Sequence, residues 1–210
     1  MKPRRLPPLV ADIVKTAIST VDNVTFTGHS VCPACGGSLV GYDTKRKQFA
    51  HLLTASGQKT VYVDVKRFRC RDCHEFCLAD NPFYPDTRIG SVIIDLCIAL
   101  SMTMPVNRVP AYLATMGIDV DRSSCRLYVR NNSSYYVRNN LYYIETNRLS
   151  SLHLPRSVLV LSRMALFADE ENCITESDIL AACGFPSAQR MGSHRRFPLE
   201  QWGKRETDGY

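Results

Sequence analysis

The sequence predicts an α+β fold, with a β-rich segment near the N-terminus and helices after it. Between residues 24 and 80, apolar and polar residues alternate as they do in half-buried strands. Five later segments carry apolar residues at helical spacing, and four cysteines form two Cys-X-X-Cys pairs in the strand-rich part. A length of 210 residues and an apolar fraction of 45% suit one or two small globular domains.

An amphipathic helix is expected over residues 8–21, behind a short basic arm. Apolar residues recur there at helical spacing, and Pro8 fits the first turn of a helix. Because the polar face is not basic, this helix is expected to pack on the protein core rather than on a membrane. We find no apolar stretch long enough to span a membrane and no secretory signal pattern.

The two cysteine pairs predict a structural zinc site. Two residues between thiolates let one tight turn direct both sulfurs at one ion, and two such turns complete a tetrahedral cage. Iron is the alternative metal, since sulfur cages also accept it, and four buried thiols without a metal are the simplest alternative. Paired spacing seldom arises from packing alone, so Zn²⁺ is the expected cofactor. The predicted ligands are Cys32, Cys35, Cys70 and Cys73.

A β-hairpin is expected to bring the second cysteine pair to the first, as in a zinc ribbon. Residues 49–53 and 60–68 have strand character and flank a turn at residues 56–58. A further strand is expected over residues 38–42, and residues 45–47 are expected to be a turn or an exposed edge.

Three helices are expected after the ribbon, over residues 89–103, 107–116 and 122–132. Asn107 is the expected N-cap of the second and Asp121 that of the third, while Gly117 ends the second. A helix, a short helix, a Gly-containing turn and a third helix are typical of a helix-turn-helix.

The third of these helices carries a row of arginines. On a helical wheel Arg122, Arg126 and Arg130 fall within about 80° of one another, with Ser123 along one edge of the row. Arginine reaches guanine edges or phosphates with paired hydrogen bonds, so this face is expected to enter the major groove of DNA. An ordinary solvated helix face is the alternative.

The ribbon holds a second basic set that could contact phosphates. The net charge of the chain is +6, and the excess lies in the first 150 residues, which favours a polyanionic partner. The set consists of Lys45, Arg46, Lys47, Arg67 and Arg69.

Three runs of sequence carry a resemblance to a known family: Cys32-Pro-Ala-Cys-Gly-Gly, Val65-Lys-Arg-Phe-Arg-Cys-Arg-Asp-Cys73 and Val109-Pro-Ala-Tyr-Leu-Ala-Thr-Met-Gly. Through them residues 30–132 resemble the N-terminal part of prokaryotic insertion-sequence transposases, in which a zinc ribbon precedes a helix-turn-helix that grips the transposon end. It implies that the four cysteines bind zinc and that the three arginines face DNA.

After residue 140 the sequence departs from those transposases, whose nuclease domain holds three separated carboxylates for paired metals. Here the acids at residues 169–171, Glu176 and Asp178 lie in an expected loop and at a helix start, where acids complement the helix dipole. No nucleophile and base are arranged for catalysis either, so the chain is not expected to be an enzyme.

Four regions follow from these patterns: an arm and helix (1–28), a zinc ribbon (29–85), a helix-turn-helix (86–140) and a small helical module (141–210). The last region contains expected helices over residues 154–168 and 176–183. Thr175 is the expected cap of the second, and Gly184 closes it.

The sequence thus predicts a zinc-containing, sequence-specific DNA-binding protein, transposase-derived or a transcription regulator. Double-stranded DNA is the expected partner, with a second copy or other nucleoprotein subunits as further partners. The alternatives are an adaptor that uses the ribbon for protein contact and a catalytic recombinase with an unrecognised site. The cysteine spacing favours a reducing cytoplasm, where the protein would associate with the nucleoid.

Overall fold

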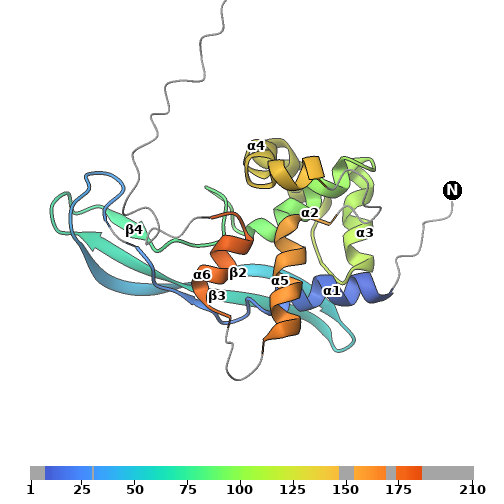
Figure 1. Cartoon of the computed structure of the whole chain (residues 1–210), viewed down its shortest axis with the longest axis horizontal. Coiled ribbons are helices and arrows are strands. Elements are labelled where there is room, and N and C mark those ends of the chain that lie inside the picture. The colour runs from blue at the N-terminus through green and yellow to red at the C-terminus, as the bar shows by residue number, and fades with distance from the viewer. Residues whose placement is uncertain (1–7, 30, 147–153, 169–173, 186–210) are drawn as a thin grey trace, which may run out of the picture.

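The computed structural model describes residues 8–29, 31–146, 154–168 and 174–185, with side chains omitted for 138–146. These residues form a mixed α+β fold with a four-stranded sheet and six α-helices (Figure 1). In chain order the elements are α1 (Pro8–Ser19), β1 (Thr25–Phe26), β2 (Leu39–Thr54), β3 (Gly57–Cys70), β4 (Phe76–Leu78), α2 (Ser91–Ser101), the 3₁₀ turn η1 (Val106–Arg108), α3 (Val109–Thr115), α4 (Arg122–Thr146), α5 (Arg156–Phe167) and α6 (Glu176–Ala182).

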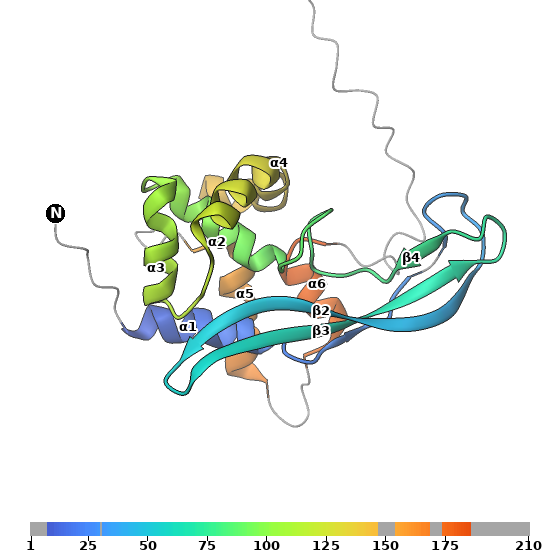
Figure 2. The same ribbon diagram turned by 180° about the vertical axis from the view of Figure 1, so that it is seen from behind.

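The sheet is built on a long β-hairpin. β3 is its central strand: β2 pairs antiparallel with one edge, and the short strands β1 and β4 pair with the other. The helices gather over one end of the hairpin, while the end that bears β4 projects beyond them (Figures 1 and 2). The two ends of the sheet therefore have different environments, one packed and one open to solvent.

Residues 45–47, predicted to be a turn or an exposed edge, lie inside the edge strand β2. The prediction of an exposed edge is confirmed and that of a turn is wrong. β2 pairs with β3 continuously from Leu39 to Thr54, and the two predicted strands are one. The register shifts between Gly41 and Asp43 and again between Gln48 and Ala50. Such bulges bend a strand and increase its local twist. Residues 45–47 lie between the two bulges and keep regular pairing with β3.

One hydrophobic core joins the packed face of the sheet to the helices. Val61, Val63 and Val65 are fully buried on alternate positions of β3, as the sequence pattern predicts. All ten residues of α2 from Ser91 to Leu100 are buried, so this helix lies at the centre of the helical layer. α1 packs along α5, which brings the N-terminal helix and the last part of the chain together.

The start of α2 packs tightly against the sheet. The N–H of Gly90 donates to the carbonyl of Phe49 at 2.9 Å, and a Cβ on Gly90 would lie 2.2 Å from the Phe49 ring. A heavy atom cannot fit there, because the nearest obstacle is a buried ring in close-packed surroundings. Glycine is therefore required at this position.

Replacing Gly90 with alanine is expected to lower the free energy of unfolding by about 1–3 kcal/mol, because the added methyl group overpacks the contact with Phe49. Urea unfolding followed by circular dichroism measures the change. Gly28→Ala is the matched control, since its Cβ would meet only Oε1 of Glu176, at 3.6 Å. Equal destabilisation by the two substitutions would contradict the argument.

The helix α4 is longer than predicted, running to Thr146 instead of residue 132. Its second half is rich in Asn, Ser and Tyr and lacks the apolar periodicity that marks a helix in sequence, but it contains no Gly or Pro to end one. The predicted cap is confirmed: Oδ1 of Asp121 accepts the N–H of Ser124 at 2.9 Å.

The other predicted caps divide into one error and one confirmation. Asn107 does not cap α3; it lies in η1, and Arg108 occupies the N-cap position without a side-chain cap. Thr175 caps α6 through a reciprocal capping box with Asp178, as expected from the sequence. Each predicted helix is present in the residues that the structure describes.

The turn before α4 is fixed to the tip of the hairpin. The N–H of Leu53 donates to the carbonyl of Gly117 at 2.8 Å, and the N–H of Asp119 donates to the carbonyl of His51 at 3.0 Å. Gly117 has the positive φ of 78° that ends α3. The sheet therefore positions the first turn of α4.

Candidate metal centre and predicted nucleic-acid contacts

The two cysteine pairs lie in tight loops at the open end of the sheet, the first before β2 and the second between β3 and β4. In each loop the residue after the second cysteine has a left-handed backbone: φ is 76° at Gly36 and 63° at His74. In the first loop the N–H of Cys32 donates to the carbonyl of Gly37 at 3.0 Å. The chain thus curls around its own sulfurs, and His74 serves the backbone turn.

All four cysteine sulfurs lie within 4.8 Å of one another. Sulfurs from different loops are neighbours: Sγ of Cys32 is 3.6 Å from Sγ of Cys73, and Sγ of Cys35 is 3.5 Å from Sγ of Cys70. In a tetrahedral cage with a zinc–sulfur bond of about 2.3 Å, adjacent sulfurs are about 3.8 Å apart. The donor set and its spacing therefore fit a Zn²⁺ ion, and the four predicted ligands form one cluster.

Backbone N–H groups point at two of the sulfurs. Gly37 donates to Sγ of Cys35 and Asp72 donates to Sγ of Cys70, each at 3.4 Å. Such bonds favour the thiolate over the thiol, and the thiolate is the form that binds metal. The two loops are thus arranged to hold negative charge.

The thiols also affect one another's ionisation. The N–H groups of Cys73 and Asp72 lower the pKa of Cys70 to about 7. The N–H of Glu75 favours the Cys73 thiolate, but the other sulfurs and burial outweigh it and raise the pKa of Cys73 to about 12. Because a bound cation replaces the thiol protons, metal binding to this cluster is expected to release protons.

The two loops lie close together at Gly37. A Cβ at this position would lie 1.9 Å from Oδ2 of Asp72. A side chain at Gly37 would therefore displace the Asp72 side chain, which is exposed. Glycine at this position leaves room for Asp72 beside the first loop.

The remaining thiols lie outside the cluster. In the part of the chain that the structure describes, the four cysteines are the only His, Cys, Asp or Glu group close enough to share a metal. Cys77 lies nearby on β4, and burial raises the pKa of its thiol. The buried cysteines Cys97, Cys125 and Cys183 are core residues, as the sequence predicts, and Cys173 lies outside the described residues.

The predicted reading face of α4 is solvent-exposed. Arg122, Ser123, Arg126 and Arg130 are all exposed in the first half of the helix, and no described residue forms an ion pair with any of the three arginines. On another face of the helix Cys125 is fully buried. The Arg126 guanidinium donates to Oδ1 of Asn107 through Nε at 3.0 Å and Nη2 at 2.6 Å.

The basic residues of the ribbon do not form one surface. Lys45 and Lys47 lie opposite Val65 and Val63 and so share their face of the sheet, whereas Arg46 lies on the other face. The Lys47 ammonium sits 3.8 Å from the centre of the Phe83 ring, and burial lowers its pKa. Lys47 is thus poorly placed for a phosphate.

Two of the ribbon arginines already have partners. Arg46 donates to Oδ1 of Asn23 at 2.7 Å and lies over the ring of Tyr62. Arg67 forms a bidentate pair with Asp43, which raises the pKa of the guanidinium. Lys45 and Arg69 are exposed, and neither forms an ion pair with a described residue. The pKa of the Asp43 carboxyl is lowered by Arg67 and, to a smaller extent, by Lys45 nearby. The nine predicted DNA contacts therefore form two sets, one on α4 and one on the sheet, and the sheet residues are themselves divided between its two faces. The sheet and α4 lie on different sides of α2 (Figure 2).

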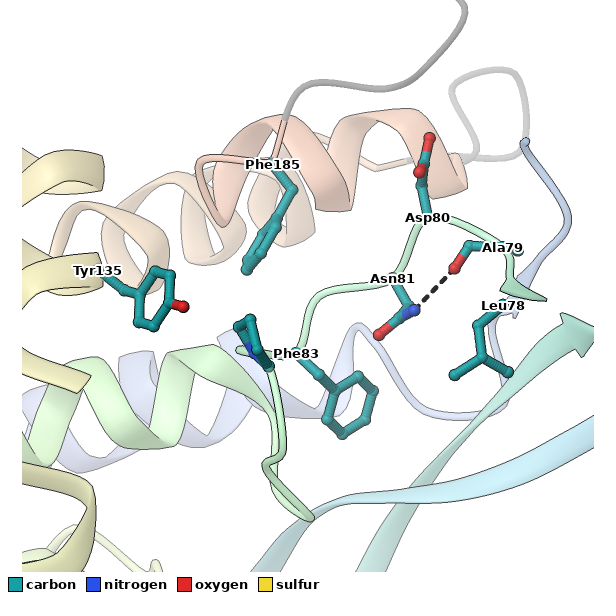
Figure 3. Close-up of a pocket in the computed structure, with 8 residues that line it drawn as sticks. Leu78, Ala79, Asp80, Asn81, Phe83, Tyr135 and Phe185 are labelled. Atoms are coloured by element: carbon teal, nitrogen blue, oxygen red, sulfur yellow. Dashed lines mark hydrogen bonds between the residues drawn. The ribbon is translucent and has the colours of Figure 1, made fainter. Parts of the chain in front are cut away.

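A pocket of about 310 Å³ lies between α4, the end of β4 with the segment that follows it, and the turn after α6. Phe83, Tyr135 and Phe185 line it, with Asn81 and Asp80 at its polar side (Figure 3). Nδ2 of Asn81 is bonded to the carbonyl of Ala79 at 2.7 Å. None of the residues predicted to bind metal or DNA lines this pocket.

Sequence reasoning missed a buried polar group in the helical layer. Asp95 of α2 is 1% exposed; its Oδ1 accepts the hydroxyl of Tyr84 at 2.6 Å and its Oδ2 accepts the hydroxyl of Ser157 at 3.0 Å. An acid within an otherwise apolar helical run was the available signal, since buried charges require partners. The group links three separate segments of the chain.

No protein family, curated protein or solved structure matches this chain in the comparisons made. The resemblance to insertion-sequence transposases therefore remains a prediction, and the metal cluster is the part of it that the structure supports. Among the described helices none combines the length and apolar character needed to cross a membrane.

Proposed function

We propose that this protein is a zinc-containing, sequence-specific DNA-binding protein that has no catalytic site of its own. The observation that carries the proposal is the exposed row of Arg122, Arg126 and Arg130 on a capped helix. A helix fits the major groove of DNA, and a forked guanidinium can pair with the O6 and N7 atoms of guanine. In this proposal the zinc cluster has a structural role: it holds the two cysteine loops together at the solvent-exposed end of the sheet.

The packing of α4 supports its role as the reading helix. α4 contacts both α2 and α3, and Tyr128 and Val129 pack against the core from the inner side of α4. The outer side adds Ser123 and the exposed Leu127 to the arginines. An apolar side chain beside arginines suits readout of thymine methyl groups next to guanines.

Arg126 is oriented before any ligand binds. Its two bonds to Asn107 engage Nε and one N–H of Nη2, and a guanidinium has five N–H donors in all. The remaining donors are available to a base or a phosphate. A side chain held in one orientation loses less entropy on binding, so Arg126 is the arginine expected to contribute most to site preference.

Selection of bound sequences from random duplexes tests the proposal, followed by binding measurements over a range of salt concentrations. The wild-type protein is expected to select a defined site, and its log–log salt slope should be about −0.9 for each phosphate neutralised. Arg122→Ala/Arg126→Ala/Arg130→Ala is expected to abolish site preference and to reduce the slope, because base and phosphate contacts are lost together.

A matched variant replaces the same three arginines with lysine. It keeps the charge but loses the forked donors, so it is expected to retain salt-dependent binding while site preference relaxes. A folded alanine variant that binds duplexes as the wild type does would refute the reading helix and favour an adaptor. Divalent-dependent nicking of the selected duplex would instead favour a recombinase.

A further inference from the structure

An exposed aromatic and cationic surface lies next to the metal cluster, at the open end of the sheet. We call it the ribbon face and define it as Val40, Tyr42, Arg67, Arg69 and Phe76. Val40 on β2, Arg69 on β3 and Phe76 on β4 are direct neighbours across three strands, so they point to the same side. Arg67 lies on that side too, two residues before Arg69.

No described part of the helical layer covers this face. The side chains of Tyr42 and Phe76 are 60% and 52% exposed, and Val40 is 40% exposed. The hairpin end that carries them extends past the helices in both views of the molecule (Figures 1 and 2). Large apolar side chains gathered on one open surface usually mark a binding site.

The ribbon face is fixed in place by its own contacts. The rings of Tyr42 and Phe76 meet edge to face, with centroids 4.9 Å apart and planes at 66°. The Arg67 guanidinium lies 5.5 Å from the Tyr42 ring and 6.0 Å from the Phe76 ring, and its pair with Asp43 holds it there. A ligand would therefore find the rings already ordered, which lowers the entropy cost of binding.

We propose that the ribbon face binds single-stranded nucleic acid, whose unpaired bases stack on Tyr42 and Phe76. Exposed aromatic rings beside arginines on a sheet are suited to this ligand, because every base has a π-face and every nucleotide a phosphate. Arg69 lies between Val40 and Phe76 and is the group placed to neutralise a phosphate.

The charge of the ribbon face favours single-stranded nucleic acid over an apolar protein surface. An apolar protein surface would have to bury Arg69, for which we find no carboxylate partner among the described residues. Duplex DNA keeps its bases stacked inside the helix, out of reach of the two rings. The site is separate from α4 and does not depend on duplex recognition by that helix.

Fluorescence anisotropy with the zinc-loaded full chain and a labelled oligothymidylate of twelve nucleotides tests this proposal. Tyr42→Ala/Phe76→Ala is expected to raise the Kd for the single strand about 30-fold or more, the effect of losing two base stacks. Zinc content by mass spectrometry checks that the ribbon stays folded. Tyr42→Trp is expected to retain binding, because the larger ring still stacks.

Tyr62→Ala is the matched control, since Tyr62 is an exposed tyrosine on the opposite face of the same sheet with Arg46 over its ring. It should leave single-strand binding unchanged. Equal loss in Tyr62→Ala, no single-strand binding by the wild type, or unchanged binding by the double variant would each overturn the proposal. A change of oligomeric state in the double variant, seen by light scattering, would assign the face to contact between copies instead.

The two proposals can fail separately. Loss of duplex selection in the arginine variant of α4 with intact single-strand binding would support the ribbon face as an independent site. If the α4 variant loses single-strand binding while the ring variant keeps it, the single strand binds α4 and the ribbon-face proposal is wrong.

Discussion

Cys73→Ser is expected to reduce the zinc content from one ion per chain to none and to unfold the open end of the sheet. Serine cannot supply a thiolate, and the three remaining sulfurs do not complete a tetrahedral cage. Because such a site forms only in the folded chain, the free energy of metal binding, about 10–16 kcal/mol in zinc-finger peptides, is also folding free energy. Mass spectrometry of the purified protein measures the metal.

Hydrogen exchange should show which part of the fold depends on the ion. Protection is expected to fall in the first half of β2 and in β4, where few side chains are buried, and to persist around Val61 and Val63, which lie in the core. A loss of protection throughout the chain would mean that the cluster supports the entire fold rather than its open end.

Cys77→Ser is the matched control for this experiment. Cys77 is a partly buried thiol beside the cluster but is not one of its four members. It should keep a full complement of zinc. Full metal occupancy in Cys32→Ser/Cys70→Ser would show that the ion binds elsewhere, and visible absorption by the purified protein would indicate iron.

Acid is expected to release the metal, since protons compete with it for the sulfurs. Metal binding requires thiolates, and thiols whose pKa is raised, such as Cys73, take up a proton most readily once the ion leaves. Affinity for zinc should therefore rise with pH across the neutral range.

The features predicted from sequence were those that depend on neighbours close along the chain. The Cys-X-X-Cys spacing identified the cluster because a two-residue gap already fixes the loop. The caps Asp121 and Thr175 were recognisable for the same reason, since each bonds an N–H three residues ahead. The cysteine cluster and the two helix caps could therefore be predicted from residues close together in the sequence.

The features that sequence could not supply depend on register and on distant segments. Arg67 was a candidate phosphate contact, but the bulge at Tyr42 sets Asp43 opposite it and so pairs the two. Neither the bulge nor the pairing leaves a pattern in the sequence of one strand. The ribbon face was missed likewise, because Tyr42 and Phe76 meet only once β2 and β4 flank β3.

Asp95→Ala is expected to lower the free energy of unfolding by about 2–4 kcal/mol, because it removes a buried group that accepts two hydroxyl hydrogen bonds. The substitution leaves the hydroxyls of Tyr84 and Ser157 without this acceptor in a closely packed interior, and it opens a small cavity in α2. Urea unfolding followed by far-ultraviolet circular dichroism measures the change. Since α4 packs on α2, binding of the selected duplex should weaken at temperatures where the variant begins to unfold.

The partners of Asp95 provide the controls. Ser157→Ala removes one donor and leaves the carboxylate bonded to Tyr84, so its cost should be smaller, about 1–2 kcal/mol. The double variant Asp95→Ala/Ser157→Ala contains no serine hydroxyl that could lack an acceptor. Its loss of unfolding free energy should therefore be smaller than the sum of the losses in the two single variants. If Asp95→Ala proved no more costly than Ser157→Ala, the carboxylate would not be the hub that joins α2 to α5 and to the segment before it.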